Sequence, residues 1–229
     1  TFWWGLLGPV NGGSVCYTMV QAILGNMPGE PPPVRELIHI QLRTLFRLGP
    51  YGQLVAVNEP GGRPAPRVFV SRGDGERLVR IRMDVPERWC RSWLACQDDA
   101  ELARRVAAQA PVEREHRGPA FALPRGIEAG RASRVRDAGQ LHPALASFAP
   151  DIPGGVFGVF EDGLAVAVCY SSRSGESADE AGVETAPDFR GRGLATEAVR
   201  TWAAWVQSRG KLALYSTTWN NEASRRIAA

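Results

Sequence analysis

The chain has 229 residues, of which 44% are hydrophobic and 22% are charged, and its formal net charge is +3. This balance is typical of a globular protein that buries a core, and it does not suggest an intrinsically disordered chain. The 27 lysine and arginine residues are dispersed and lack interleaved aromatic residues, so the sequence gives little support to nucleic-acid binding.

The first segment, residues 1–26, is apolar but interrupted by glycine and proline. It lacks a basic leader and is too short between the interruptions to cross a bilayer, so we expect neither an anchor nor a signal peptide and no membrane partner. Its "GPVNGGS" lacks the Lys-Ser/Thr ending of a nucleotide-hydrolase phosphate loop. Because Met27 is a natural start, we expect residues 1–26 to lie outside the functional unit.

Residues 27–118 are predicted to form a small α+β unit. Apolar residues at helical spacing predict an amphipathic helix over residues 34–48, and these are Leu37, Ile38, Leu42, Leu45 and Phe46. Short apolar runs between turn residues then predict strands, with a hairpin at "RGDGER". Helical spacing returns over residues 87–110.

Residues 119–229 are predicted to form a second unit, because the stretch 111–126 is rich in proline, glycine and charge. A hairpin is expected around Asp162-Gly163. The next strand, "EAGVETA", places Glu180, Gly182 and Glu184 on one face. A helix over 194–208, a strand in "KLALYSTTW" and a helix capped by Asn220 or Asn221 follow.

The cysteines and histidines show no metal-binding spacing. Cys16, Cys90, Cys96 and Cys169 include no CxxC pair, and the three histidines stand far apart. We therefore expect neither a metal site nor a disulfide framework. Reduced thiols are typical of a cytoplasmic protein, and Cys169 is predicted to be a core residue.

The stretch "DFRGRGLA" joins the predicted strand to the predicted helix. Such a turn leaves unpaired N–H groups at the positive end of a helix dipole, and its glycines let a phosphate approach the main chain. Arg190 and Arg192 would add positive charge. The alternative is an ordinary glycine turn with solvated arginines, since short glycine motifs recur by chance.

The residues "RGRGLA" match the Q/R-x-x-G-x-G/A signature of the GNAT acetyltransferase superfamily, and "LYSTTWNNEASRRIA" resembles the strand and the asparagine-containing helix that follow in it. The stretches "VNEPGGRPAPRVFV" and "VRIRMDVP" are similar to the N-terminal extension of a branch associated with zwittermicin-type self-resistance. The resemblance implies an α/β (α+β) fold with a mixed, mostly antiparallel sheet flanked by helices, preceded by the smaller unit.

The resemblance also implies a binding site for acetyl-CoA where the strand 180–185 and the strand 211–218 diverge. Backbone groups of Val183 and Thr185 would pair with the pantetheine. The pyrophosphate would be held by the N–H groups of Arg190, Gly191, Arg192, Gly193, Leu194 and Ala195. Asn221 and Ser224 would reach the cofactor from the other wall, and the alternative for both is simple helix capping.

Acetyl transfer to an amine needs a neutral amine, so a general base is useful. Glu180 and Glu184 share the strand face that the family directs toward the acceptor, and either could take the proton. The alternative is a solvent-facing or salt-bridged carboxylate.

Two departures from the family pattern stand out. Many members carry a tyrosine seven residues after the helix asparagine, where this chain has Ala228, so no general acid is assigned. The chain also stops at Ala229, where the family adds two further strands, so we expect a C-terminally truncated domain.

The leading hypothesis is an N-acetyltransferase acting on a small-molecule or peptide amine. The alternative is a catalytically silent GNAT-fold module that binds CoA or a partner; the sequence does not indicate an oligomeric state.

Overall fold

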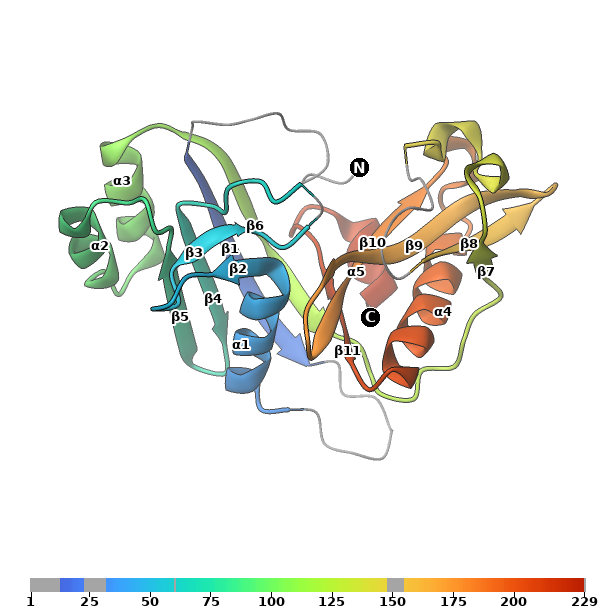
Figure 1. Ribbon diagram of the computed structural model, residues 1–229, viewed down its shortest axis with the longest axis horizontal. Helices are drawn as coiled ribbons and strands as arrows, with labels where there is room; N and C mark the ends of the chain where they lie inside the picture. Colours follow the sequence, from blue (N-terminus) through green and yellow to red (C-terminus); the bar gives the residue numbers. More distant parts are fainter. Residues whose placement is uncertain (1–12, 23–31, 60, 148–154, 229) are drawn as a thin grey trace.

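A computed structural model describes residues 13–22, 32–59, 61–147 and 155–228. One sheet of nine strands runs through the described chain in the order β5-β4-β1-β6-β11-β10-β9-β8-β7, with a separate two-stranded pair β2-β3 (Figure 1). The strands of the large sheet, in that order, are Glu76–Ile81, Val68–Gly73, Gly13–Ala22, Val112–Ala122, Leu212–Ser216, Ala178–Thr185, Leu164–Ser174, Val156–Glu161 and Ser133–Val135. The pair β2 and β3 spans Phe46–Leu48 and Leu54–Val57.

Five α-helices are described, and they cover both faces of the large sheet. They are α1 Val34–Leu45, α2 Glu87–Leu94, α3 Asp99–Gln109, α4 Leu194–Ser208 and α5 Glu222–Ala228. The strands β1–β4, β1–β6 and β10–β11 pair in parallel and the other strand pairs are antiparallel. The predicted mixed, mostly antiparallel sheet flanked by helices is therefore confirmed.

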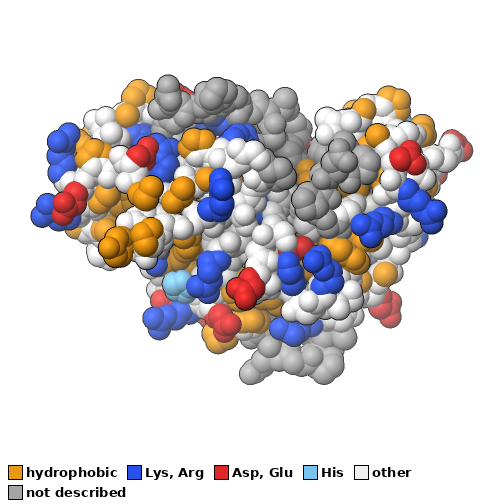
Figure 2. Space-filling model, in the orientation of Figure 1, with side chains coloured by type: hydrophobic (Ala, Val, Ile, Leu, Met, Phe, Trp, Pro, Cys, Tyr) orange, Lys and Arg blue, Asp and Glu red, His pale blue; other side chains and the backbone are white. Residues whose placement is uncertain are grey.

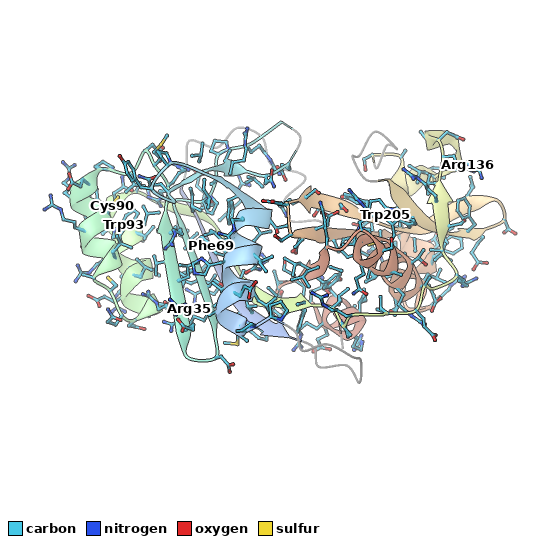
Figure 3. The ribbon with its side chains drawn as sticks, turned by 60° about the horizontal axis from the view of Figure 1, so that its bottom comes forward. Arg35, Phe69, Cys90, Trp93, Arg136 and Trp205 are labelled. Atoms are coloured by element: carbon cyan, nitrogen blue, oxygen red, sulfur yellow. The ribbon has the colours of Figure 1, made fainter. Side chains whose placement is uncertain are left out.

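Alternating side chains divide the core between the two faces of the sheet. Helix α1 packs with Ala178 and Leu214 on one face. Helix α4 packs with Ala181 and Ala213 on the opposite face, where the predicted core residue Cys169 is also buried. Figure 3 shows Trp205 on α4, whose ring lies 5.4 Å from that of Phe157 on β8. On the same face as α4, helices α2 and α3 cover the other half of the sheet, and Trp93 of α2 is fully buried there (Figure 3).

The predicted helix over 34–48 is confirmed as far as Leu45. The expectation is wrong for residues 46–48, which form β2, because the backbone of Phe46 is extended and pairs with Val57 of β3. All five residues predicted for the apolar side are buried. The ring of Phe46 meets that of Phe69 edge-on at 5.2 Å, so this side chain serves the core from a strand.

Both predicted Asp-Gly hairpins are confirmed. Asp74-Gly75 has φ of 50° and 77°, and Asp162-Gly163 has φ of 48° and 82°. Positive φ at both central residues is the signature of the turn that matches strand twist. The predicted helical region 87–110 is two helices, because Asp98 accepts hydrogen bonds from the N–H groups of Ala100 and Glu101 and so starts α3.

Strands β1 and β6 were not expected as strands. They pair with each other over ten positions, from Gly13↔Val112 to Ala22↔Ala122. The expected division of the chain into residues 1–26, 27–118 and 119–229 stays a prediction. Strand β1 lies within the first of these segments, and β6 crosses the boundary between the second and the third. Among the described helices, none has the length and apolar character needed to cross a membrane.

Candidate active site

Strands β10 and β11 pair at one end and diverge at the other. Their parallel pairing covers only Ala178↔Leu212, Asp179↔Ala213 and Glu180↔Leu214. Strand β10 then continues to Thr185 along β9, whereas β11 continues to Ser216 along β6 (Figure 1). The divergence predicted from the family resemblance is therefore confirmed, and it begins at Glu180.

The backbone of β10 presents polar groups to this divergence. The N–H of Ala186 donates to the carbonyl of Val166 at 2.8 Å, toward β9. Because N–H groups alternate in direction along an antiparallel strand, those of Val183 and Thr185 point away from β9, toward the side that β11 has left. This is the orientation expected for the two residues, while their contact with a pantetheine stays a prediction.

The turn before α4 exposes a row of N–H groups. Gly191 and Gly193 have φ of 77° and 74°, and a Cβ at either would meet no atom within 4 Å. The N–H groups of residues 191–195 donate to no atom of the described chain. They lie at the N-terminus of the fifteen-residue α4, where the helix dipole favours an anion.

Both arginines of this turn bond to neighbouring protein atoms. Arg190 donates to the Thr185 carbonyl at 3.1 Å and lies 3.2 Å from a carboxylate oxygen of Glu184. Arg192 donates to the Asp188 carbonyl at 2.9 Å. Both residues are exposed. Their role in binding a phosphate stays a prediction. Glu184 is already engaged by a cation, which is the ion-paired alternative considered for it.

Glu180 lies where the strands begin to diverge, and only 2% of it is exposed. The Ser216 hydroxyl donates to its Oε1, while its Oε2 has no hydrogen-bond partner in the described chain. Burial raises the pKa of Glu180, and the Ser216 hydrogen bond and the Arg173 guanidinium partly oppose this. Glu180 therefore combines a raised proton affinity with one uncommitted oxygen, the properties required of a general base.

Asn221 and Ser224 stand at the start of α5, beyond the end of β11. The Asn221 carbonyl oxygen accepts the Ser224 N–H at 3.0 Å, and the Ser224 hydroxyl lies 2.5 Å from the hydroxyl of buried Tyr215. The capping role considered for Asn221 is thus observed. Cofactor binding by either residue stays a prediction.

This region of the chain matches a known protein family. Residues 131–228 match the model of the acetyltransferase (GNAT) family. This part of the chain is similar to the GNAT family. Members of the family are N-acetyltransferases that use acetyl-CoA. The narrower resemblance to the zwittermicin-resistance branch stays a prediction, and no curated protein matches the chain.

Solved GNAT structures resemble the chain weakly. A putative acetyltransferase from Novosphingobium aromaticivorans DSM 12444 shares 23% identity over 46% of this chain and 50% of its own, with a TM-score of 0.36. A GNAT acetyltransferase from Colwellia psychrerythraea shares 13% identity over 86% and 91%, with a TM-score of 0.37. The chain spans about half the length of the first relative.

Two β9 side chains that the sequence did not single out lie on the face of β10 that carries Glu180. Arg173 of β9 is the register partner of Glu180, and the ring of Tyr170 lies over Gly182. Tyr170 is buried, with 8% of it exposed. The register of β9 on β10 shifts between Glu180 and Ala181, so residue parity on β9 could not have placed Arg173 on this face.

Proposed function

We propose that the chain is an acetyl-CoA-dependent N-acetyltransferase that moves an acetyl group to an amine of a small molecule or peptide. One arrangement carries the proposal: the divergence between β10 and β11 lies beside a glycine turn whose N–H groups, from residues 191–195, have no partner in the described chain. A long acyl carrier with a pyrophosphate matches both features. The match of residues 131–228 to the GNAT family model supports the same ligand.

The residues present fit this co-substrate. Open space at Gly191 and Gly193 lets a pyrophosphate approach the main chain, and their positive φ turns the N–H groups toward it. Val183 and Thr185 would pair with the pantetheine through their backbone N–H groups, which point away from β9. Asn221 would add its amide N–H₂, because only its oxygen is used in capping α5.

The reaction transfers one acetyl group and one proton. The lone pair of a neutral amine attacks the thioester carbonyl carbon, the carbon–sulfur bond breaks, and the thiolate leaves. Glu180 would take the proton that the amine nitrogen loses, through its uncommitted oxygen. Glu184 is the second candidate, held by Arg190. A CoA thiol has a pKa within about two units of neutrality on the cysteine scale, so the thiolate can leave without an assigned acid.

The cysteines support a cytoplasmic location for this enzyme. All four are free thiols, and Cys16, Cys96 and Cys169 are buried. Free thiols are typical of a reducing compartment. Fractionation of the native cells, with a periplasmic or secreted marker beside a cytoplasmic one, tests this location.

Isothermal titration with acetyl-CoA tests the proposed ligand. We expect binding of acetyl-CoA and of CoA to one site, and weaker binding of a pantetheine that lacks the pyrophosphate. A folded protein that binds none of the three would contradict the proposal. Binding of CoA without thiol release in the presence of any amine would instead indicate the catalytically silent module.

A further inference from the structure

A buried arginine links the candidate base to the N-terminal part of the chain. Arg173 is 7% exposed, and as the register partner of Glu180 it lies on the neighbouring strand beside it. Its guanidinium also lies 3.2 Å from Oε2 of Glu59, which follows strand β3. Arg173 is therefore ion-paired with Glu59 and, on the strand next to β10, is the register partner of Glu180.

Glu59 is itself held in place. Its Oε1 accepts a hydrogen bond from Arg63 at 2.6 Å, while its Oε2 faces Arg173, and its side chain is 14% exposed. The neighbouring Asn58 donates to the carbonyls of Thr44 on α1 and Ser174 on β9, at 3.1 and 2.9 Å. These hydrogen bonds hold the loop after β3 against the end of β9, and so they fix the position of Glu59.

We propose that Glu59 is a positioning residue for Glu180: by pairing with Arg173, the register partner of Glu180, it keeps Glu180 able to accept a proton. This inference rests on the proposed function for its catalytic meaning. The N-terminal part of the chain then contributes a charge to the reaction, in addition to any contact with the acceptor.

The physical reason is charge balance. A lone buried arginine beside Glu180 would stabilise its ionised form and make it a weak base. In the proposal, Glu59 offsets the charge of Arg173 and so weakens its effect on Glu180. Burial raises the pKa of Glu180, and Arg173 opposes this only in part. The salt bridge between Arg173 and Glu59 is nearly buried, so solvent screens these charges less than surface charges.

The other elements packed around Glu180 add little charge. From β11 come Ser216 and the buried hydroxyl of Tyr215, and from β1 the thiol of Cys16, whose pKa burial raises to about 12. His116 of β6 is kept neutral near pH 7, because burial and then Arg173 lower its pKa to about 4. Helix α1 buries only uncharged side chains against the sheet. Across β10, Glu184 is paired with Arg190.

The test measures the protonation of Glu180 directly, so it does not depend on activity. In full-length protein labelled with ¹³C at the glutamate side-chain carboxyl, the Glu180 signal is assigned by its loss in Glu180→Gln and titrated with pH. Glu59→Gln removes the charge that offsets Arg173, so we expect the pKa of Glu180 to fall by about 0.5 to 1 unit. Arg173→Gln is expected to raise it by about 1 to 2 units.

Two further variants make the proposal falsifiable. The double variant Glu59→Gln/Arg173→Gln removes one charge of each sign and should return the pKa of Glu180 to within about 0.5 unit of its original value. Arg63→Gln, at a partly exposed site, removes a cation that pairs with Glu59, so Glu59 should interact more strongly with Arg173. We expect the pKa of Glu180 to rise slightly in this variant, which provides a test even if Glu59→Gln fails to fold. Glu101→Gln, which breaks an exposed ion pair with Arg105, is the matched control and should change nothing.

Opposite shifts in the two single variants, followed by the same shifts in the acid limb of kcat/KM, support the proposal. The proposal is overturned if the pKa of Glu180 is unchanged in both Glu59→Gln and Arg63→Gln. It is also overturned if Glu59→Gln shifts this pKa in the same direction as Arg173→Gln. If the titrations shift as expected but neither the wild type nor any variant releases thiol, the positioning role of Glu59 stands and the proposed acetyl transfer is contradicted.

Discussion

The ring of Tyr170 lies over Gly182, its register partner on the neighbouring strand. A Cβ at Gly182 would stand 2.6 Å from Cζ, the ring carbon that bears the Tyr170 hydroxyl. Gly182 is therefore required for the space it leaves and not for an unusual φ. It lies on β10 between Glu180 and Glu184, so this contact is on the face that carries both candidate bases.

Replacing Gly182 with alanine should displace the Tyr170 ring. Because this ring is packed in a buried apolar cluster, we expect a loss of about 1 to 3 kcal/mol in the free energy of unfolding, typical of overpacking. Chemical denaturation measures this loss. Gly139→Ala is the control, since its new Cβ would meet only a carboxylate oxygen of Asp137 at 3.1 Å. Equal stabilities of the two variants would contradict the account.

Gly193→Ala should weaken acetyl-CoA binding beyond its effect on folding. Alanine at φ 74° costs about 1 to 2 kcal/mol, and the new Cβ stands where the pyrophosphate is expected. Gly210, near the other end of α4, has φ 75° and equally open surroundings, so Gly210→Ala carries the same backbone strain. We expect the Kd for acetyl-CoA to rise about tenfold or more, equivalent to about 1.4 kcal/mol, only in Gly193→Ala. Similar Kd values in the two variants would show that the phosphate assignment is wrong.

Asn221 allows capping and cofactor binding to be separated. Asn221→Ala should cost about 0.5 to 2 kcal/mol through the lost cap, and Asn221→Ser should restore most of that stability. Serine lacks the amide N–H₂, so the proposed cofactor contact stays lost. Calorimetry with acetyl-CoA should therefore find weaker binding in both variants. Full recovery of affinity in Asn221→Ser would leave Asn221 with the capping role alone.

His116 should make the protein less stable in acid. Burial and then Arg173 lower its pKa from 6.5 to about 4. The unfolded chain takes up a proton on this imidazole as the pH falls through 6.5, while the folded protein does not until about pH 4, so acid favours unfolding in this window. The contribution of His116 is at most about 3 kcal/mol. Denaturation between pH 7 and pH 4 should show a shallower pH dependence in His116→Gln than in wild type, and parallel curves would contradict this.

Local signals were sufficient for the elements with strong patterns. The Asp-Gly hairpins, the turn at Gly191 and Gly193, and most of α1 follow from residue spacing and from φ preferences. Strand β6 was missed because its first half alternates exposed and half-buried polar residues and contains a glycine and a proline, which resemble a linker. Strand β1 was missed because its neighbours in the sheet, β4 and β6, are distant in sequence.

The parts of the candidate site that belong to a sequence motif were predicted. The parts that depend on contacts between residues distant in sequence were missed. Glu180 and the glycine turn could be located from the sequence. The partners of Glu180 could not be predicted, because a register shift of β9 on β10 makes Arg173 its register partner. A loop contact then brings Glu59 to Arg173. The engagement of Glu184 by Arg190 likewise depends on how the turn folds back on β10.

A thiol-release assay over a broad panel of amines tests the central claim most directly, with the wild type and Glu180→Gln compared at equal acetyl-CoA occupancy. We expect amine-dependent thiol release by the wild type and a loss of about a hundredfold or more in Glu180→Gln, the usual contribution of a general base. Acetyl-CoA binding with no thiol release from any amine, or equal rates in the two proteins, would contradict the claim.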